Sequence, residues 1–126
     1  RLIPSLIESF INKKNFQSTK GNQVRDFCYI DDVNDAIINC IELNKRYQFP
    51  LIMDIGSGKG IKIKTVINKI KNNFKDSKIK INTNLKKIQR NNLVADISKA
   101  KKILKWSPKV NFEKGLEKTI NYFKNK

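Results

Sequence analysis

The stretch GNQVRDFCYIDDVND, residues 21–35, decides how the rest of the chain is interpreted. It begins with a glycine and an arginine, and an alternating aromatic and apolar run then leads to three carboxylates. Glycine before such a run is typical of a turn, and carboxylates are favoured at a helix start, where they accept backbone N–H groups. The order predicts a turn, a strand over Arg25–Ile30 and a helix with Asp32 as its N-cap.

Length and composition limit the class of protein. The 126 residues suffice for one core and contain two cysteines and no histidine. Cys28 and Cys40 do not form a Cys-x-x-Cys pair, which argues against a structural zinc site and favours a reducing cytoplasm. The sequence has no apolar run of membrane-spanning length and no signal peptide. Because it opens at Arg1, without methionine and inside a helical pattern, we expect a piece of a longer protein.

The net charge of +16 raises nucleic-acid binding as one hypothesis, because lysine and arginine neutralise phosphates. The excess is nearly all lysine, however, and it is spread from Lys13 to Lys126 among many isoleucines and asparagines. Lysine, isoleucine and asparagine rise together in A/T-rich genomes, and dispersed lysines are typical of a solvated surface. The composition therefore favours a partner other than a nucleic acid.

The spacing of apolar residues predicts one α/β domain over residues 1–126, a mixed α+β lobe with about five helices and short strands. The expected helices are Leu2–Ile11, Asp32–Asn44, Ile63–Phe74, a short one from Ser98 to Leu104, and Phe112–Phe123. The expected strands are Arg25–Ile30, Leu51–Ile55 and Ile79–Ile81. We expect Ser98 to cap the short helix and Trp106 to fill the core.

The glycine-rich run Gly56–Gly60 lies between an expected strand and an expected helix, where a nucleotide-binding loop would sit. It resembles the first motif of S-adenosylmethionine-dependent methyltransferases and, more loosely, a dinucleotide fingerprint. A dinucleotide site needs its third glycine one residue later and an acid after the next strand, whereas Asp76 precedes that strand. Two interpretations stay open: a tight turn whose glycines permit positive φ, and a methyltransferase-like site.

Arg25 is the most specific polar residue, because a guanidinium at a strand entrance can fork onto phosphate or carboxylate oxygens. An internal salt bridge to a neighbouring aspartate is the other interpretation. Arg90 is a second candidate for binding an anion, against a solvated surface arginine. Capping explains Asp31, Asp32 and Asp35 better than a metal does. The sequence shows no histidine and no serine or cysteine beside a base, so no catalytic set is visible.

Three motifs in order resemble the extended short-chain dehydrogenase/reductases that act on nucleotide sugars. GNQVRDFCYIDDVNDAI (residues 21–37) is similar to the family segment G-x-x-x-R-D-F-x-Y-V-D-D-V, and MDIGSG (53–58) to Y-N-I-G-S-G. ADISKAKKILKWSPKV (95–110) with FEKGLEKTI (112–120) is similar to the closing D-x-S-K-A-x-x-x-L-G-W-x-P, E-x-G-L element. The series runs over nearly the whole chain, which makes it more specific than any one motif.

The resemblance implies that residues 1–126 are the C-terminal, nucleotide-sugar-binding lobe of an NAD-dependent epimerase, dehydratase or 4-keto reductase. The N-terminal Rossmann domain, which holds NAD or NADP and the catalytic Tyr-x-x-x-Lys pair, would be absent from this chain. The implied ligand is a nucleoside-diphosphate sugar, with no nucleic-acid or membrane partner, and the full-length enzyme would be a homodimer. The chain by itself would have no catalytic residue and no activity.

The resemblance also assigns roles to individual residues. The substrate-binding set is Arg25 on the diphosphate or nucleoside with Phe27 nearby, Ser18 and Lys20 lining the base pocket, Ile63 packing on the base, and Arg90 as a second diphosphate ligand. The sequence departs from the family at two positions outside this set. Asp54 replaces an asparagine, and Lys105 replaces the glycine of L-G-W. A left-handed backbone at Lys105 would cost about 1 kcal/mol with any residue but glycine.

Overall fold

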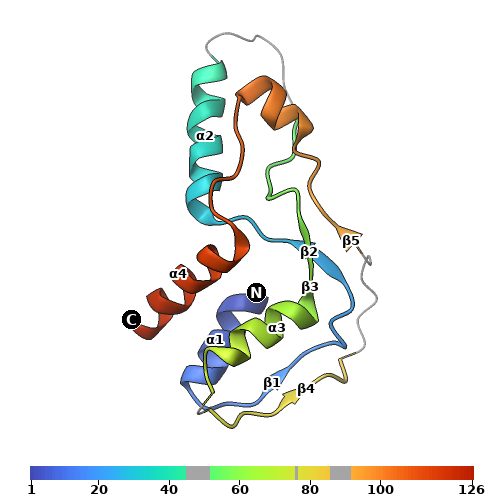
Figure 1. The fold of residues 1–126 in the computed structure, drawn as a ribbon, viewed down its shortest axis with the longest axis vertical. Helices are drawn as coiled ribbons and strands as arrows, with labels where there is room; N and C mark the ends of the chain where they lie inside the picture. Colours follow the sequence, from blue (N-terminus) through green and yellow to red (C-terminus); the bar gives the residue numbers. More distant parts are fainter. Residues whose placement is uncertain (45–51, 76, 86–91) are drawn as a thin grey trace. The chain divides into compact units, whose positions relative to one another are not determined.

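The computed structural model describes residues 1–44, 52–75, 77–85 and 92–126 (Figure 1). The chain divides into two compact units, each built from segments distant in sequence. Unit 1 comprises Arg1–Arg25, Ile61–Asn92 and Leu116–Lys126, and unit 2 comprises Asp26–Gly60 and Leu93–Gly115. The single lobe over residues 1–126 stays a prediction, and each unit is described by itself below.

Unit 1 is a helical layer with a short parallel strand pair. It contains α1 (Leu2–Ile11), β1 (Phe16–Gln17), α3 (Ile63–Asn72), β4 (Ile81–Asn82) and, from Leu116 onward, α4 (Phe112–Lys124). α1 packs on α3, and β1 pairs with β4 so that Phe16 lies opposite Ile81. The buried positions recur at spacings of three and four: Leu6, Ile7 and Phe10 on α1, Ile63, Val66, Ile67 and Ile70 on α3, and Leu116 and Ile120 on α4. These are the faces that the sequence pattern predicts.

The ends of three helices in unit 1 are joined by an aromatic cluster. The rings of Phe10 and Phe74 stack with their centroids 5.1 Å apart and their planes 9° apart. The Lys124 ammonium lies 4.8 Å from the centroid of the Phe74 ring, a cation–π arrangement. Its Nζ also donates to the carbonyl of Asn73 at 3.4 Å. The last turn of α4 is thereby fixed beside the end of α3.

Unit 2 packs α2 (Ile30–Asn44) on the short π-helical segment η1 (Ala100–Leu104). The buried cluster between them consists of Ala36, Ile97, Ala100, Leu104 and Trp106, flanked by Cys28, Cys40, Leu43, Met53, Ile55 and Ala95. Ala36 on α2 and Ala100 on η1 are small, and the Trp106 side chain fills the volume beside them. Trp106 is 3% exposed, which confirms its predicted place in the core.

The remaining strands form a sheet of order β3-β2-β5, from β2 (Val24–Asp26), β3 (Gly60–Lys62) and β5 (Asn92–Leu93). Across the described residues the chain forms five helices, four α and one π, together with these short strands. This agrees with the predicted α/β class. None of the described helices is long and apolar enough to cross a membrane.

All three predicted strands are wrong in extent, and of Ile79–Ile81 only Ile81 lies in a strand, β4. β2 ends at Asp26 and α2 begins at Ile30, so the strand expected over Arg25–Ile30 is reduced to its first two residues. Leu51 lies outside the described residues, and positions 52–55 belong to no strand, with Ile52 85% exposed. Strand propensity measures how well a segment fits between neighbours, so an apolar run becomes a strand only where a partner strand pairs with it.

Two predicted helix caps are also wrong. Asp32 cannot be the N-cap of α2, because that helix begins two residues earlier, at Ile30. Ser98 does not cap the short helix as an acceptor, because its backbone N–H and its hydroxyl both donate to Asp96 Oδ1. These donations lower the pKa of the Asp96 carboxyl. In the first case the Asp32 carboxylate accepts N–H groups of a distant segment, and in the second Asp96 is the acceptor in place of Ser98.

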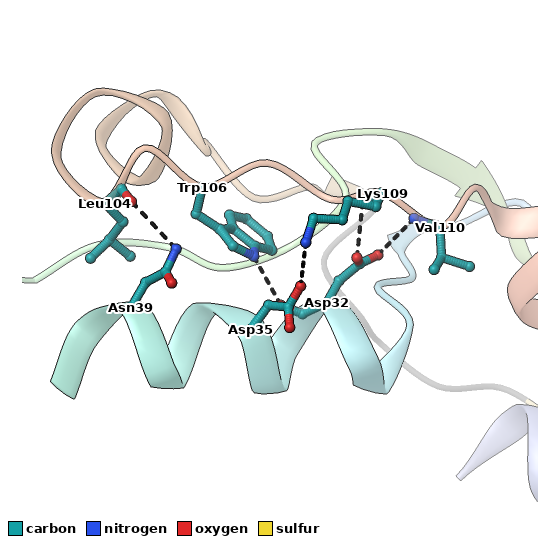
Figure 2. Close-up of polar contacts among 7 residues, drawn as sticks. All are labelled: Asp32, Asp35, Asn39, Leu104, Trp106, Lys109 and Val110. Atoms are coloured by element: carbon teal, nitrogen blue, oxygen red, sulfur yellow. Dashed lines mark hydrogen bonds and ion pairs between the residues drawn. The ribbon is translucent and has the colours of Figure 1, made fainter. Parts of the chain in front are cut away.

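Asp32 and Trp106 instead fix the closing segment on α2, as Figure 2 shows. The indole Nε1 of Trp106 donates to the Asp32 carbonyl at 2.9 Å. The Asp32 carboxylate, 2% exposed, accepts the backbone N–H groups of Lys109 at 2.9 Å and Val110 at 3.0 Å. Nearer the surface, Lys109 Nζ pairs with Asp35 at 2.7 Å, and this raises the pKa of Lys109. The buried carboxylate therefore serves as the acceptor for a chain segment 77 to 78 residues away.

Lys105→Gly is expected to raise the free energy of unfolding by about 1 kcal/mol. Lys105 has φ 53° and ψ 29°, the left-handed conformation in which a Cβ atom is strained and glycine is not. Urea denaturation followed by circular dichroism measures the change. Lys101→Gly is the matched control, because Lys101 lies inside η1 and glycine there should destabilise the chain. Equal effects of the two substitutions would contradict the strain at Lys105.

Candidate functional site

The Asp26 carboxylate joins three segments of unit 2. Its Oδ1 accepts the Ser57 N–H at 2.9 Å and the Ser57 hydroxyl, while its Oδ2 accepts the Gly58 N–H at 2.9 Å and the Ala95 N–H at 3.2 Å. A carboxylate accepts about four hydrogen bonds, so its capacity is filled by the protein itself. The strand that carries Arg25 is thereby held to the glycine turn and to the segment that follows β5.

The glycine run is shaped by the same carboxylate. A Cβ on Gly56 would lie 2.5 Å from the Ala95 Cβ and 2.7 Å from Asp26 Oδ2, so a side chain there would displace the Asp26 contacts. Gly58 has φ +69° and packs on Ile97. These features confirm a tight turn that needs its glycines. Asp76, the acidic residue considered for a dinucleotide site, lies outside the described residues.

The turn does not fit a dinucleotide or S-adenosylmethionine. A phosphate-binding loop uses its free backbone N–H groups to bind the anion. Here the N–H groups of Ser57 and Gly58 already donate to Asp26, and an anionic ligand would approach that carboxylate. The methyltransferase-like interpretation gains no support either, because the same N–H groups are bonded within the protein, and the glycine run serves the packing of unit 2.

Arg25 stands at the centre of β2, immediately before Asp26. Its side chain is half-buried, and its Nη1 donates to the Val24 carbonyl at 2.7 Å. The strand and the Asp26 contacts fix its backbone, which reduces the entropy that a phosphate-binding arginine loses when it meets its ligand. The diphosphate-binding role of Arg25 stays a prediction at this point.

In unit 1 the start of α3 is held against the segment that follows Gly21. The N–H of Lys64 donates to the Gly21 carbonyl at 2.9 Å, and the N–H of Ile63 to the Gln23 carbonyl at 3.0 Å. Gly21 has φ +73°, and a Cβ on it would lie 2.7 Å from the Lys64 nitrogen. This close approach requires glycine, and it brings Ile63 to the stretch that carries Lys20.

The four other predicted site residues are in different settings. Ser18 is 5% exposed, and its backbone bonds to Asn82 and Leu85, while Lys20 is exposed. Phe27, in unit 2, packs its ring on Phe112 at 5.5 Å between centroids. Arg90 lies outside the described residues. The structure thus joins the Gly21 stretch to Ile63, and the roles of all six residues stay predictions.

Asp26 is the residue of the site that sequence reasoning missed, since it entered there only as a possible salt-bridge partner of Arg25. A signal was present in the motif R-D-F, which pairs a candidate ligand-binding arginine with a carboxylate. The partners of that carboxylate lie 31 to 69 residues further on, and no local pattern points to them.

Two further aspartates, Asp32 and Asp35, are bonded within unit 2. Asp32 accepts backbone donors and Asp35 pairs with Lys109. Among the residues that the structure describes, no three His, Cys, Asp or Glu side chains converge as a metal ion would require. Cys28 and Cys40 are free thiols. Burial, with Asp32 and Asp26 adding negative charge, raises the pKa of Cys28 to about 11.

In a Cys40→Ser variant, the rate of Cys28 alkylation by iodoacetamide should keep rising to about pH 11. The thiolate is the reactive form, and an ordinary thiol reaches its plateau near its own pKa of about 8.5. Folding suppresses ionisation between the two values, so alkaline pH also favours the unfolded chain over this range. Mass spectrometry of timed samples gives the rates, with glutathione as the free-thiol control. A plateau shared with glutathione would contradict the shift.

Unit 2 combines two features: Asp26 bonds the strand β2 to the Gly-Ser-Gly turn, and Trp106 bonds the closing segment to α2. With the fold, they identify this chain as the C-terminal part of an extended short-chain dehydrogenase/reductase. The family model described as GDP-mannose 4,6 dehydratase matches residues 1–119. The chain belongs to this family of nucleotide-sugar epimerases and dehydratases.

Relatives and solved structures agree with that assignment. A UDP-glucuronate 4-epimerase of Thermodesulfobacterium geofontis is 35% identical over 108 residues, which cover 82% of this chain and 31% of that protein. A CDP-abequose synthase of Salmonella typhimurium is 27% identical over 95% of this chain and 42% of its own length. The crystal structure of Thermotoga maritima UDP-glucose 4-epimerase with UDP-glucose matches 99% of this chain and 40% of its own, at 26% identity and a TM-score of 0.84. The chain thus spans about a third to two fifths of these proteins.

Proposed function

We propose that this chain is the substrate-binding part of an NAD(P)-dependent nucleotide-sugar epimerase, dehydratase or 4-keto reductase, and that it binds the nucleoside diphosphate. The observation that supports this most directly is the match over 99% of the chain to an epimerase crystallised with UDP-glucose. The rigid placement of Arg25 beside the fully bonded Asp26 adds a physical reason. The chemistry would take place in a longer protein of which this chain is one part.

Within that proposal the ligand contacts follow the predicted set. Arg25 supplies a planar fork of donors matched to diphosphate oxygens. Ser18, Lys20 and Ile63 line the side of the pocket that holds the nucleoside base, with Phe27 near Arg25 and Arg90 as a second anion ligand. Binding energy at the diphosphate, remote from the reacting sugar carbon, orients that carbon for reaction.

The cofactor belongs outside these 126 residues in this proposal. A relative from Bacillus cereus, a UDP-glucuronic acid 4-epimerase with 27% identity and a TM-score of 0.81, was crystallised in complex with NAD. The glycine turn of this chain does not fit a dinucleotide, because Asp26 takes its N–H groups. We therefore place NAD or NADP in a separate Rossmann domain. We also propose a homodimeric enzyme in the reducing cytoplasm, where the thiols of Cys28 and Cys40 would stay free.

Arg25→Ala in the protein that carries this chain should weaken UDP binding by roughly 10- to 100-fold. That factor corresponds to the roughly 1.5–3 kcal/mol of a lost charged hydrogen-bonded contact. Isothermal titration calorimetry with UDP measures it. Arg25→Lys keeps the charge but loses the fork, so its affinity should lie between those of the wild type and the alanine variant.

The matched control for this measurement is Arg1→Ala, which removes an exposed arginine and changes the net charge by the same amount. Its affinity for UDP should be that of the wild type. A loss of the same size in both variants would assign the effect to net charge. Unchanged affinity of Arg25→Ala, with intact circular dichroism, would overturn the assignment of Arg25.

A further inference from the structure

The net charge of the chain is divided unequally between its two units. Unit 1 contains 18 lysine and arginine residues against three acidic residues, and unit 2 contains nine against eight. Unit 1 therefore has a net charge of +15 and unit 2 of +1. A lysine-rich composition does not by itself produce this division, because unit 2 also contains eight lysines and balances them with carboxylates. The excess of positive charge is a property of unit 1 alone.

Part of this charge is gathered at one end of unit 1, where α1, α3 and α4 end (Figure 1). The segment after α3 runs beside the turn after α1: the Ser77 hydroxyl donates to the Phe10 carbonyl at 3.2 Å, and the Lys80 N–H donates to Asn15 Oδ1 at 3.0 Å. The aromatic cluster of unit 1 holds the last turn of α4 at the same end. We call six exposed lysines of these segments the basic end: Lys13, Lys14, Lys75, Lys78, Lys80 and Lys124.

The protein does not neutralise the basic end. Among the residues that the structure describes, no carboxylate pairs with any of the six ammonium groups. Lys124 contacts the Phe74 ring and the Asn73 carbonyl, and neither of these carries a net charge. Asp76, the acidic residue nearest in sequence to Lys75, lies outside the described residues. Like charges gathered in this way repel one another, and an anionic surface facing them relieves that repulsion.

The type of cation distinguishes between the possible anionic partners. Arginine is favoured for nucleic-acid phosphates, and lysine is depleted at protein–protein interfaces. The basic end consists of lysines alone, and lysine clusters of this size attract anionic lipid headgroups, whose mobile charges need no fixed geometry. Ile11 is 41% exposed, two residues before Lys13, and adds an apolar side chain of the kind that enters a headgroup layer. These features together favour a lipid surface.

We propose that the basic end of unit 1 binds the surface of an anionic lipid bilayer and holds the protein there peripherally. This goes beyond the proposed function and does not depend on it, and it departs from the resemblance, which implies no membrane partner. Each lysine close to an anionic surface contributes about 5-fold in affinity. The attraction is screened by salt, so it should be lost in about 1 M NaCl, where the Debye length falls to about 3 Å.

Flotation with lipid vesicles tests this on the protein that carries the chain. Binding to vesicles of equal parts phosphatidylcholine and phosphatidylglycerol should be at least about 100-fold tighter than to phosphatidylcholine alone. Removing four lysines of the basic end should weaken binding to the anionic vesicles at least about 100-fold, with the substitutions Lys13→Gly, Lys14→Gln, Lys78→Gln and Lys80→Gln. Lys13→Gly alone should weaken it about 5-fold without loss of the fold. Lys13 has φ 52°, the left-handed conformation in which glycine is favoured after a helix.

The matched control removes four exposed lysines of unit 2: Lys99→Gln, Lys101→Gln, Lys102→Gln and Lys114→Gln. It lowers the net charge by the same amount and should keep wild-type vesicle binding. UDP affinity should be the same in all variants, because none of these lysines belongs to the predicted ligand set.

Three results would overturn the proposal. The first is a wild-type protein that does not bind the anionic vesicles, or binding that the substitutions at the basic end leave undiminished. The second is an equal loss in the two four-lysine variants, which would assign the binding to net charge. The third is tighter binding to single-stranded RNA of random sequence than to the vesicles, lost on the same four substitutions, which would assign the basic end to a nucleic acid.

Discussion

Asp32→Asn should lower the free energy of unfolding by roughly 2–4 kcal/mol, although the two side chains have nearly the same shape. Each carboxylate oxygen of Asp32 accepts one backbone N–H, from Lys109 on Oδ1 and from Val110 on Oδ2. An asparagine offers one oxygen, so in either orientation its NH₂ group faces an N–H donor. With 2% of the residue exposed, no water replaces the lost acceptor.

Urea denaturation followed by the fluorescence of Trp106, the single tryptophan, measures this loss. Asp35→Asn is the control, because it makes the same chemical change one turn along the same helix. The Asp35 side chain is 42% exposed and its partner Lys109 75%, so that change should stay within experimental error. Equal stabilities of the two variants would show that the Asp32 contacts contribute nothing beyond surface charge.

The helices show what local sequence patterns can predict. α1 and α4 begin and end within one residue of their predicted bounds, and α3 within two at its end. Their apolar residues recur every three to four positions, and that information lies entirely within each segment. The left-handed backbone of Lys105 was indicated in another way, by the glycine that the resembling family has at this position.

Most of the features that were wrong or missed depend on partners distant in sequence; Ser98, whose acceptor Asp96 lies two residues away, is the exception. Asp32 and Asp26 bond to backbone groups from 31 to 78 residues away, so local spacing predicted a cap for one and a salt bridge for the other. The strand predicted over Leu51–Ile55 fails for a related reason, because none of the described strands pairs with positions 52–55. A ligand role such as that of Arg25 depends on a molecule that neither the pattern nor the fold contains.

Asp26→Asn should destabilise unit 2 by roughly 2–4 kcal/mol and should also weaken UDP binding in the longer protein. Asp26 accepts two N–H groups on Oδ2, from Gly58 and Ala95, and the Ser57 N–H and hydroxyl on Oδ1. An asparagine NH₂ would face at least one of these N–H donors whichever way the amide is turned. The turn and the segment after β5 would separate, and the backbone that positions Arg25 would lose its support.

Denaturation of the Asp26→Asn chain, paired with calorimetric titration of UDP into the longer protein, separates these two effects. The control is Asp54→Asn, an identical change at an exposed position in the segment that leads to the same turn. It should alter neither stability nor affinity, because asparagine is the residue that the resembling family has there. A stable Asp26→Asn chain would contradict the bonding that holds the turn. A destabilised chain with unchanged UDP affinity would instead show that Arg25 keeps its position without Asp26, and the support for the ligand site would then have to come from β2 alone.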